Sequence, residues 1–192
     1  MLFKLCDAFV GAMTGPFVIR GMGYSREEYA AIVKGPGLAA TLAGGFAGGF
    51  VARGLDLKTS LWLAAILQMA SNLVFAVQAV MPASYPILAA VIVAENFTGA
   101  IGTVIFVAYL SALCRSPLHT ATQYALLSAL SAIGRTYISA PAGYLADSAG
   151  WFWFFVLSCL TAIPSLILLA WLQARGHFDS LARPTGPLAA ED

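Results

Sequence analysis

Charged side chains are scarce in this chain, and their scarcity excludes most soluble folds. Only 10% of the 192 residues are charged and 60% are hydrophobic, whereas soluble domains carry about 25% charged residues. A compact water-soluble fold of this size cannot bury so much apolar surface. The formal net charge is +1, so no basic field favours nucleic acid as a partner. The sequence therefore predicts a protein whose solvent is the lipid bilayer.

Residues that carry metal, redox or hydrolytic chemistry are also few. Cys6, Cys114 and Cys159 have no paired spacing, which excludes a disulfide scaffold and a thiolate metal cluster. His119 lies in a loop and His177 in the tail, so no histidine proton relay or intramembrane hydrolase site is expected. The glycine motifs that bind phosphates or dinucleotides do not occur. We therefore expect no enzyme, no cofactor and no metal site.

The chain does contain a series of apolar runs long enough to cross a bilayer. Each run must satisfy its backbone hydrogen bonds internally, as a helix, because the bilayer offers no water. The sequence predicts an all-α polytopic membrane protein, with one six-helix transmembrane bundle over residues 1–173. Ser25 and Glu28 form a predicted capping box ahead of the second span. The predicted spans are 2–19, 29–52, 59–80, 86–113, 121–146 and 151–173.

Positive charges in the loops set the predicted orientation of the bundle. Arg53 and Lys58 lie in the loop after the second span, and Arg115 follows the fourth, so these loops are expected in the cytoplasm. Both termini then face the cytoplasm as well. Residues 174–192, which contain prolines and glycines, are predicted to form a disordered cytoplasmic tail. Asp7, inside the first apolar run, argues against a signal peptide.

Ionisable residues occur in four of the six predicted spans. Lys4 and Asp7 lie in the first, Lys34 in the second, Glu95 in the fourth and Arg135 in the fifth. A charge at the bilayer centre costs a few kcal/mol, so these residues should face a wet cavity, while the third and sixth spans face lipid. Lys34, Glu95 and Arg135 come within about one helical turn of one another in depth. The alternative is a structural ion pair between Glu95 and one of the two cations.

This period of three helices coincides with a repeated motif. Residues 7–12 read DAFVGA and residues 95–100 read ENFTGA, which share an acid-x-Phe-x-Gly-Ala pattern. With three helices per unit, the second copy crosses the membrane in the opposite sense. Two inverted three-helix repeats of this kind make up one half of a major facilitator transporter.

The second span contains two glycine-rich segments. The first consists of Lys34, Gly35, Pro36 and Gly37. Proline removes a backbone donor, so the segment is either a hinge or broken-helix binding element or a kink for packing. The second contains two overlapping Gly-x-x-x-Gly pairs, which allow a partner helix to approach closely. These pairs are formed by Gly44, Gly45, Gly48 and Gly49.

Four segments carry a resemblance to a known family. Residues 2–17 (LFKLCDAFVGAMTGPF), 66–76 (ILQMASNLVFA), 94–114 (AENFTGAIGTVIFVAYLSALC) and 120–136 (TATQYALLSALSAIGRT) are the segments concerned. They resemble the C-terminal half of AmpG-type muropeptide permeases of the major facilitator superfamily. Permeases for acetyl-CoA or siderophores are similar in the same regions. The superfamily's loop signature is incomplete, since Ala52 stands where an acid is usual before Arg53.

The resemblance implies proton-driven import of anhydromuropeptides, the sugar-peptide fragments of recycled cell wall, across the bacterial inner membrane. Such permeases have at least twelve helices in two bundles around one cavity. This chain, with six, is therefore expected to pair with a second six-helix half and to contact membrane lipid. Because Met1 begins directly in the first span, the sequence is consistent with a fragment or one half of a split transporter.

Site residues follow from combining this implication with the positions of the charges. Glu95 and Asp7 are the expected proton-coupling residues, because desolvation disfavours an ionised acid near the midplane. Lys34 and Arg135 are expected to hold the carboxylates of the peptide stem, Arg135 through a bidentate fork. Three further candidates could hydrogen-bond sugar or peptide: Asn96, Gln123 and Tyr124.

Two other functions fit the same sequence. The chain could be a non-transporting structural or regulatory membrane protein, which binds a partner through the glycine-rich face of the second span. It could also be a permease for another anionic solute, such as acetyl-CoA or a siderophore. Reconstituted uptake together with a second six-helix chain distinguishes transport from the structural role.

Overall fold

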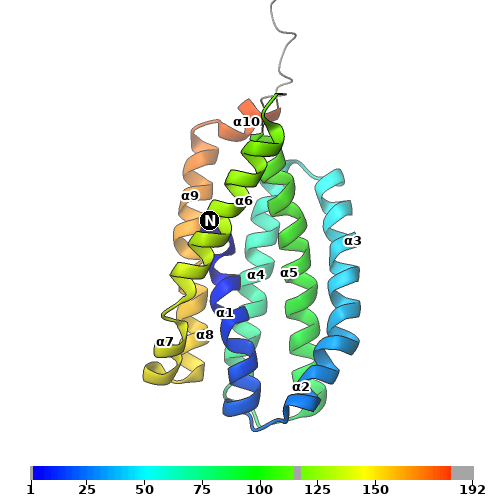
Figure 1. Ribbon diagram of the computed structural model, residues 1–192, viewed down its shortest axis with the longest axis vertical. Helices are drawn as coiled ribbons and strands as arrows, with labels where there is room; N and C mark the ends of the chain where they lie inside the picture. The colour runs from blue at the N-terminus through cyan, green and yellow to red at the C-terminus, as the bar shows by residue number, and fades with distance from the viewer. Residues whose placement is uncertain (1, 115–117, 183–192) are drawn as a thin grey trace, which may run out of the picture.

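A computed structural model describes residues 2–114 and 118–182, and over these residues the chain is all-α. The helices lie side by side along one long axis (Figure 1). In chain order the elements are η1 (Leu2–Lys4), α1 (Leu5–Pro16), η2 (Phe17–Gly21), α2 (Arg26–Ile32), η3 (Val33–Gly37), α3 (Leu38–Gly54), α4 (Leu57–Gln78), α5 (Tyr85–Leu113), α6 (Thr120–Ser139), α7 (Ala142–Ala149), α8 (Trp151–Leu160), α9 (Ile163–Ala174) and α10 (His177–Ala182).

Within residues 2–114 and 118–182, four helical stretches are long and apolar enough to cross a membrane. They are Arg26–Gly54, Leu57–Gln78, Tyr85–Leu113 and Trp151–Ala174, which correspond to the second, third, fourth and sixth predicted spans. The fifth predicted span differs, because it is divided between α6 and α7 on either side of Ala140 and Pro141. Pro141 has no backbone N–H to continue the α6 ladder. The chain is thus a multi-pass membrane protein.

The capping box predicted ahead of the second span is confirmed at the start of α2. The Ser25 hydroxyl accepts a hydrogen bond from the Glu28 N–H at 3.1 Å, and the Glu28 carboxylate accepts one from the Ser25 N–H at 2.8 Å. These two bonds satisfy backbone donors that the first helical turn leaves without partners.

The Gly-Pro-Gly segment widens the helix instead of breaking it. Residues Val33–Gly37 form the π-helical turn η3, and the flanking residues Ile32 and Leu38 keep helical dihedral angles. Pro36 cannot donate the hydrogen bond of a regular α-turn, and a wider turn lets the helix pass it. A broken helix, one of the two alternatives for this segment, is therefore wrong.

The two overlapping glycine pairs of α3 have different surroundings. Gly44 and Gly48 face α5: an added Cβ at Gly44 would overlap the carbonyl oxygen of Phe97, and one at Gly48 would lie 3.0 Å from Ile101 Cα. At Gly45, by contrast, nothing lies within 4 Å of an added Cβ. Contact between helix backbones is what small residues permit in a membrane bundle. Because this face is covered by α5, Gly44 and Gly48 do not offer it to a partner protein.

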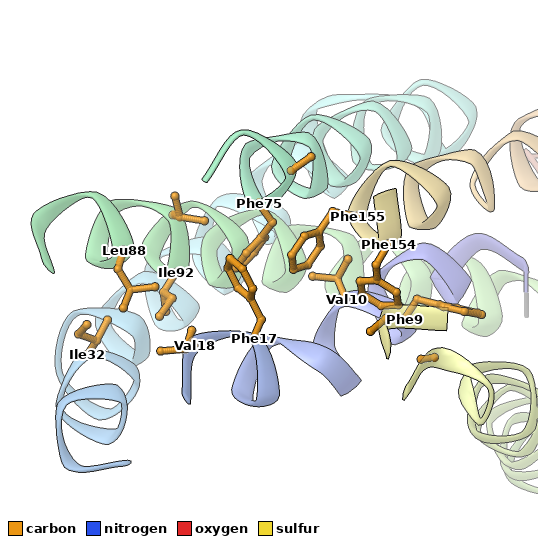
Figure 2. Close-up of a cluster of buried hydrophobic side chains, with 14 of the residues drawn as sticks. Phe9, Val10, Phe17, Val18, Ile32, Phe75, Leu88, Ile92, Phe154 and Phe155 are labelled. Carbon is orange, nitrogen blue, oxygen red and sulfur yellow. The ribbon is translucent and has the colours of Figure 1, made fainter. Parts of the chain in front are cut away.

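The larger apolar core lies between α1, η2, α4, α5 and α8 and includes a group of aromatic rings. Figure 2 shows Phe17 of η2, Phe75 of α4 and Phe155 of α8 close together. The ring centroids of Phe17 and Phe155 are 4.9 Å apart, and those of Phe75 and Phe155 are 5.3 Å apart. All three side chains are buried. Edge-to-face and offset contacts of this kind favour one arrangement of the three helices.

The end of the described chain folds back onto the bundle. Phe178 of α10 is 8% exposed, and the Tyr109 hydroxyl lies 3.2 Å from His177 Nε2. The disorder predicted from residue 174 onward is therefore wrong for residues 177–182, because an apolar side chain of this turn finds a site beside α5. The remainder of the predicted tail, 183–192, lies outside the described residues.

Substituting Gly44 tests the contact between α3 and α5. In the detergent-solubilised full chain, Gly44→Ala should lower the free energy of unfolding by about 1–3 kcal/mol, because the methyl group forces α3 away from α5. Gly45→Ala is the matched control and should change it by less than about 0.5 kcal/mol. Denaturant titration followed by tryptophan fluorescence measures both. Equal losses in the two variants would contradict the described approach of α3 to α5.

The loop between α3 and α4 gives a pH-dependent test of a helix cap. Asp56 is the N-cap of α4, and hydrogen bonds from the Thr59 hydroxyl and backbone N–H hold the pKa of Asp56 below its ordinary value of 3.8. The stability that this ionised cap contributes is present above pH 3.8 and is lost as the pH falls through the lower folded value.

We therefore expect Asp56→Ala to lower the melting temperature at neutral pH and to have progressively less effect in acid. The difference in melting temperature between wild type and variant is measured by thermal unfolding from neutral pH down to a pH well below the ordinary pKa of Asp56. A difference that does not depend on pH would mean that the Asp56 charge has no part in capping α4.

Candidate functional site

A buried polar network joins three helices in the middle of the bundle. Lys4 Nζ lies 2.6 Å from Asp7 Oδ2, and Gln68 Nε2 donates to Asp7 Oδ1 at 2.7 Å. Lys4 Nζ also donates to the carbonyl oxygen of Gly99 at 3.4 Å. Lys4 and Gln68 are each only 4% exposed. Both oxygens of the Asp7 carboxylate are therefore engaged, one by an ammonium group and one by an amide.

Two glycines of α5 leave room for this network. An added Cβ at Gly102 would lie 3.0 Å from Gln68 Oε1, and one at Gly99 would lie 3.7 Å from Asp7 Oδ1. The pair is spaced by three residues, so both face the same side of α5. Larger residues there would compete with the side chains that α1 and α4 send toward α5.

A polar cavity of about 380 Å³ opens beside the network, between α1, α3 and α5. Its two ionisable residues are Asp7 and Glu95, the acids of the repeated motif. The other residues of its wall are small or neutral: Thr41, Gly45, Asn96, Gly99, Ala100, Thr103 and Val104. The cavity thus combines acidic groups with hydroxyl and amide groups, which suits hydrogen bonding to a polar ligand or the exchange of a proton.

Glu95 and Asp7 differ in their surroundings although they share the cavity. Within residues 2–114 and 118–182, the Glu95 carboxylate makes no hydrogen bond and no ion pair. Glu95 interacts electrostatically with Asp7 and Lys4 across the site and with Tyr29 of α2. Glu95 is therefore a partly buried acid with no fixed partner, next to an acid that has two.

Asn96 and Thr41 connect the opposite wall of the cavity. The Thr41 hydroxyl lies 3.2 Å from Asn96 Oδ1 and 3.0 Å from the carbonyl oxygen of Gly37. Asn96 Nδ2 donates to the carbonyl oxygen of Ile92 at 2.8 Å. The Asn96 amide is thus held between α5 and the junction of η3 with α3, with its side chain on the cavity wall.

Lys34 and Arg135, the predicted anion-binding residues, do not meet Glu95 in this chain. Lys34 is exposed on η3, and Arg135 is exposed on α6, which has no buried residue. Within the described part of the chain neither side chain forms an ion pair, and neither lines the cavity. Among the described residues the three side chains therefore do not line one cavity, and Glu95 forms no ion pair with either cation, while the substrate-binding roles of Lys34 and Arg135 stay predictions. Depth along a helix does not determine which way a side chain points.

The remaining predicted residues lie away from the cavity. Gln123 and Tyr124 are half-buried in the first turns of α6. Arg53 is exposed at the end of α3, beside Phe46 and Phe50. Lys58, at the start of α4, lines a small hollow together with Asp56, Ala112 and residues of α10. The basic loop is thus in contact with α10.

Two members of the polar network, Lys4 and Gln68, have no predicted site role. Lys4 precedes Asp7 by three residues, and this spacing places the two charges on one face of a helix. Gln68 belongs to a polar stripe at helical spacing, together with Ser71 and Asn72, all of them buried. Its helix, α4, contains no charge in its middle, so a search for charged residues does not detect it.

The prediction that the third span faces lipid holds for only one side of α4. The outer side exposes Ile66, Leu73, Val74 and Val77. The inner side buries four polar residues: Gln68, Ser71, Asn72 and Gln78. Among these, the Gln68 amide is bonded to Asp7, and a neutral polar group with a partner can be buried at much lower cost than a charge, so α4 reaches the site without carrying an ionisable residue there.

Curated relatives match most of the chain. It is 40% identical over 169 residues to the anhydromuropeptide permease of Escherichia coli K12, a match that covers 88% of this chain and 34% of that protein. It is 38% identical over 175 residues to the putative transporter AmpG 4 of Rickettsia felis, covering 91% of this chain and 42% of that protein. An uncharacterised protein of Haemophilus influenzae is 32% identical over 178 residues. No protein-family model matches the chain.

These relatives include permeases and transporters and give no support to an enzyme. The chain spans about a third of the length of the E. coli permease and 42% of the Rickettsia protein. With its membrane helices and a polar cavity between them, the chain is a homologue of AmpG-type anhydromuropeptide permeases over about a third of the E. coli relative's length.

Proposed function

We propose that the chain forms one half of a proton-coupled secondary transporter that imports anhydromuropeptides across a bacterial inner membrane. The observation that carries the proposal is the cavity beside α5, which is lined by both acids of the repeated motif, Asp7 from α1 and Glu95 from α5. An acid at such a site can alternate between a protonated and an ionised form as the cavity changes its access. Homology to permeases supplies the substrate class.

The proposal includes six membrane spans arranged as two inverted three-helix repeats. α1 and α5, which carry the two copies of the motif, run in opposite directions along the bundle (Figure 1). This is the relation that inverted repeats predict. In this arrangement the first span is α1 with η2, and the fifth is α6 with α7. The proposed topology places both termini in the cytoplasm, because positive charges gather in the loops on that side.

A second six-helix half is the proposed partner, with lipid around the remainder. α6 buries none of its residues, although it carries polar groups and Arg135. α3 likewise exposes a row of apolar side chains, with Phe46 and Phe50 each 74% exposed. Helices with these faces need a neighbouring protein or lipid to cover them. Lys34, on η3 just before α3, and Arg135, on α6, would then meet the carboxylates of the substrate across the junction with the other half.

Within the cavity the neutral groups suit the sugar or peptide part of the substrate. Asn96 and Thr103 provide amide and hydroxyl groups on α5 and Thr41 another hydroxyl on α3. In this proposal Glu95 binds the coupling proton, and Gln123 and Tyr124 lie toward the cytoplasmic mouth. A structural or regulatory membrane protein is the alternative from another functional class. A permease for acetyl-CoA or a siderophore is the alternative within transport.

Uptake by proteoliposomes tests the proton role of Glu95. The full chain is reconstituted with the unmatched part of the E. coli permease, and a pH gradient is imposed. We expect Glu95→Gln to reduce gradient-driven uptake to the level of protein-free vesicles, because a neutral amide cannot release a proton. Exchange of labelled for unlabelled substrate should persist, since substrate binding is retained.

Asp147→Asn, which neutralises an exposed acid of α7, is the control and should transport like wild type. Gradient-driven uptake by Glu95→Gln at the wild-type rate would contradict the proton role. Absence of uptake by the wild-type pair, for anhydromuropeptide as well as for acetyl-CoA and siderophore, would favour the structural alternative.

Substitution of Arg135 tests the binding of the anionic peptide stem. Arg135→Lys keeps the charge but loses the planar fork, so KM for anhydromuropeptide should rise about tenfold, the factor that 1.4 kcal/mol represents. A substrate analogue whose stem carboxylates are amidated should show no difference between the two proteins. An unchanged KM for the anionic substrate would mean that no bidentate pair forms.

A further inference from the structure

We propose that Lys4 and Gln68 are positioning residues that hold Asp7 as a fixed carboxylate, and that Glu95 is the one of the two cavity acids that exchanges protons. This inference rests on the proposed transport function and goes beyond it, because it divides the two acids of the motif between two roles. Asp7 becomes a permanent counter-charge inside the bundle. Glu95 becomes the group whose charge changes.

Each oxygen of the Asp7 carboxylate accepts a bond from a different side chain. Asp7 Oδ2 accepts from the Lys4 ammonium at 2.6 Å and Oδ1 accepts from the Gln68 amide at 2.7 Å. Charge-assisted hydrogen bonds of this length are among the strongest in proteins. If Asp7 took up a proton, these two bonds would lose their charge assistance and the buried Lys4 ammonium would lose its counter-charge, which is costly.

The two donors to Asp7, Lys4 and Gln68, are themselves buried. Lys4 is 4% exposed, and besides Asp7 its ammonium reaches only the Gly99 carbonyl oxygen among the described residues. Gln68 is equally buried, and Gly102 leaves the space in which its amide lies. A buried ammonium that lost Asp7 would be an uncompensated charge, so the pair is retained as a unit.

Glu95 differs from Asp7 in having no donor bonded to its carboxylate among the described residues. The described residues provide its carboxylate with no hydrogen bond or ion pair, and it lines the cavity. The titratable groups that interact electrostatically with Glu95 are Lys4 of η1, Asp7 of α1 and Tyr29 of α2. The elements packed on the other sides present neutral groups, Thr41 from α3 and Gln68 from α4. Lys34 of η3 and Arg135 of α6 are exposed and do not line the cavity.

Labelling with dicyclohexylcarbodiimide reports directly on the two acids. This apolar reagent adds a protonated carboxyl across its N=C=N group: the acid proton moves to a nitrogen and the acid oxygen bonds the central carbon. A shift of the acyl group from oxygen to nitrogen then gives a stable N-acylurea, with no leaving group. Peptide mass spectrometry of the full chain in lipid vesicles at neutral pH locates the adduct.

We expect wild type to be labelled at least about ten times more at Glu95 than at Asp7, the ratio that a 1.4 kcal/mol difference between two states produces. Lys4→Met and Gln68→Met each remove one donor and keep much of the side-chain volume, so adducts should appear at Asp7. Asn72→Leu is the matched control. Asn72 is buried on the same helix but donates to Cys6 Sγ, so its loss should leave Asp7 unlabelled.

Several outcomes would overturn the inference. Equal labelling of the two acids in wild type would show that Asp7 is not fixed, and absence of label at Glu95 would remove its role in proton exchange. Unlabelled Asp7 in both methionine variants would show that Lys4 and Gln68 do not hold it, and labelling in Asn72→Leu as well would indicate general loosening of the fold. A variant that fails to fold leaves the wild-type comparison as the test.

The labelling needs neither substrate nor a second half, so it is independent of the uptake measurement. If uptake fails and the labelling pattern is as expected, the proposed transport function is wrong and the fixed state of Asp7 stands. If uptake succeeds and Asp7 is labelled as strongly as Glu95, the division of roles is wrong and the transport function stands.

Discussion

A buried ion pair in the middle of the bundle is the constraint on which the rest of the site depends. Lys4 and Asp7 lie in an apolar bundle, where charges are tolerated only when they are paired and hydrogen-bonded. Their remaining bonds go to Gln68 of α4 and to the Gly99 carbonyl oxygen of α5. The rotation of α1, α4 and α5 relative to one another is constrained at this point, because turning any one of them would break the bond from Gln68 to Asp7 or the bond from Lys4 to the Gly99 carbonyl oxygen.

The cavity follows from the way small residues are distributed around α5. Gly99 and Gly102 face the ion pair and make room for it. On the other side α3 approaches through Gly44, which is closed against the α5 backbone, whereas Gly45 has open space and lines the cavity. Adjacent glycines on one helix thus serve two purposes, close packing and the opening of a hollow. A membrane bundle needs both where a polar site lies next to a helix contact.

Much of this fold follows from spacing along single helices, and much of the site does not. The capping box at Ser25 and the apolar runs of the long helices are local features, so their positions could be predicted from the sequence. The presence of Asp7 and Glu95 in one cavity agrees with the period of three helices. The direction in which the Arg135 side chain points depends on how α6 packs against α1, and the spacing of residues along α6 does not determine this packing. Gln68 was not predicted as a site residue, because it is neutral and lies in the uncharged middle of α4, where a search for charged residues does not detect it.

The repeat itself explains why its two acids differ. The copies agree at the acid, at Phe, at Gly and at Ala, but three residues before the acid one has Lys4 and the other has Ile92. A residue at this spacing lies on the same helical face as the acid, so the lysine pairs with Asp7 while the isoleucine is buried in the apolar core. This difference gives Asp7 a charged partner, whereas the described residues give the Glu95 carboxylate no ion pair. The two copies of the motif supply matched positions, and the surroundings of the two acids differ where the copies differ.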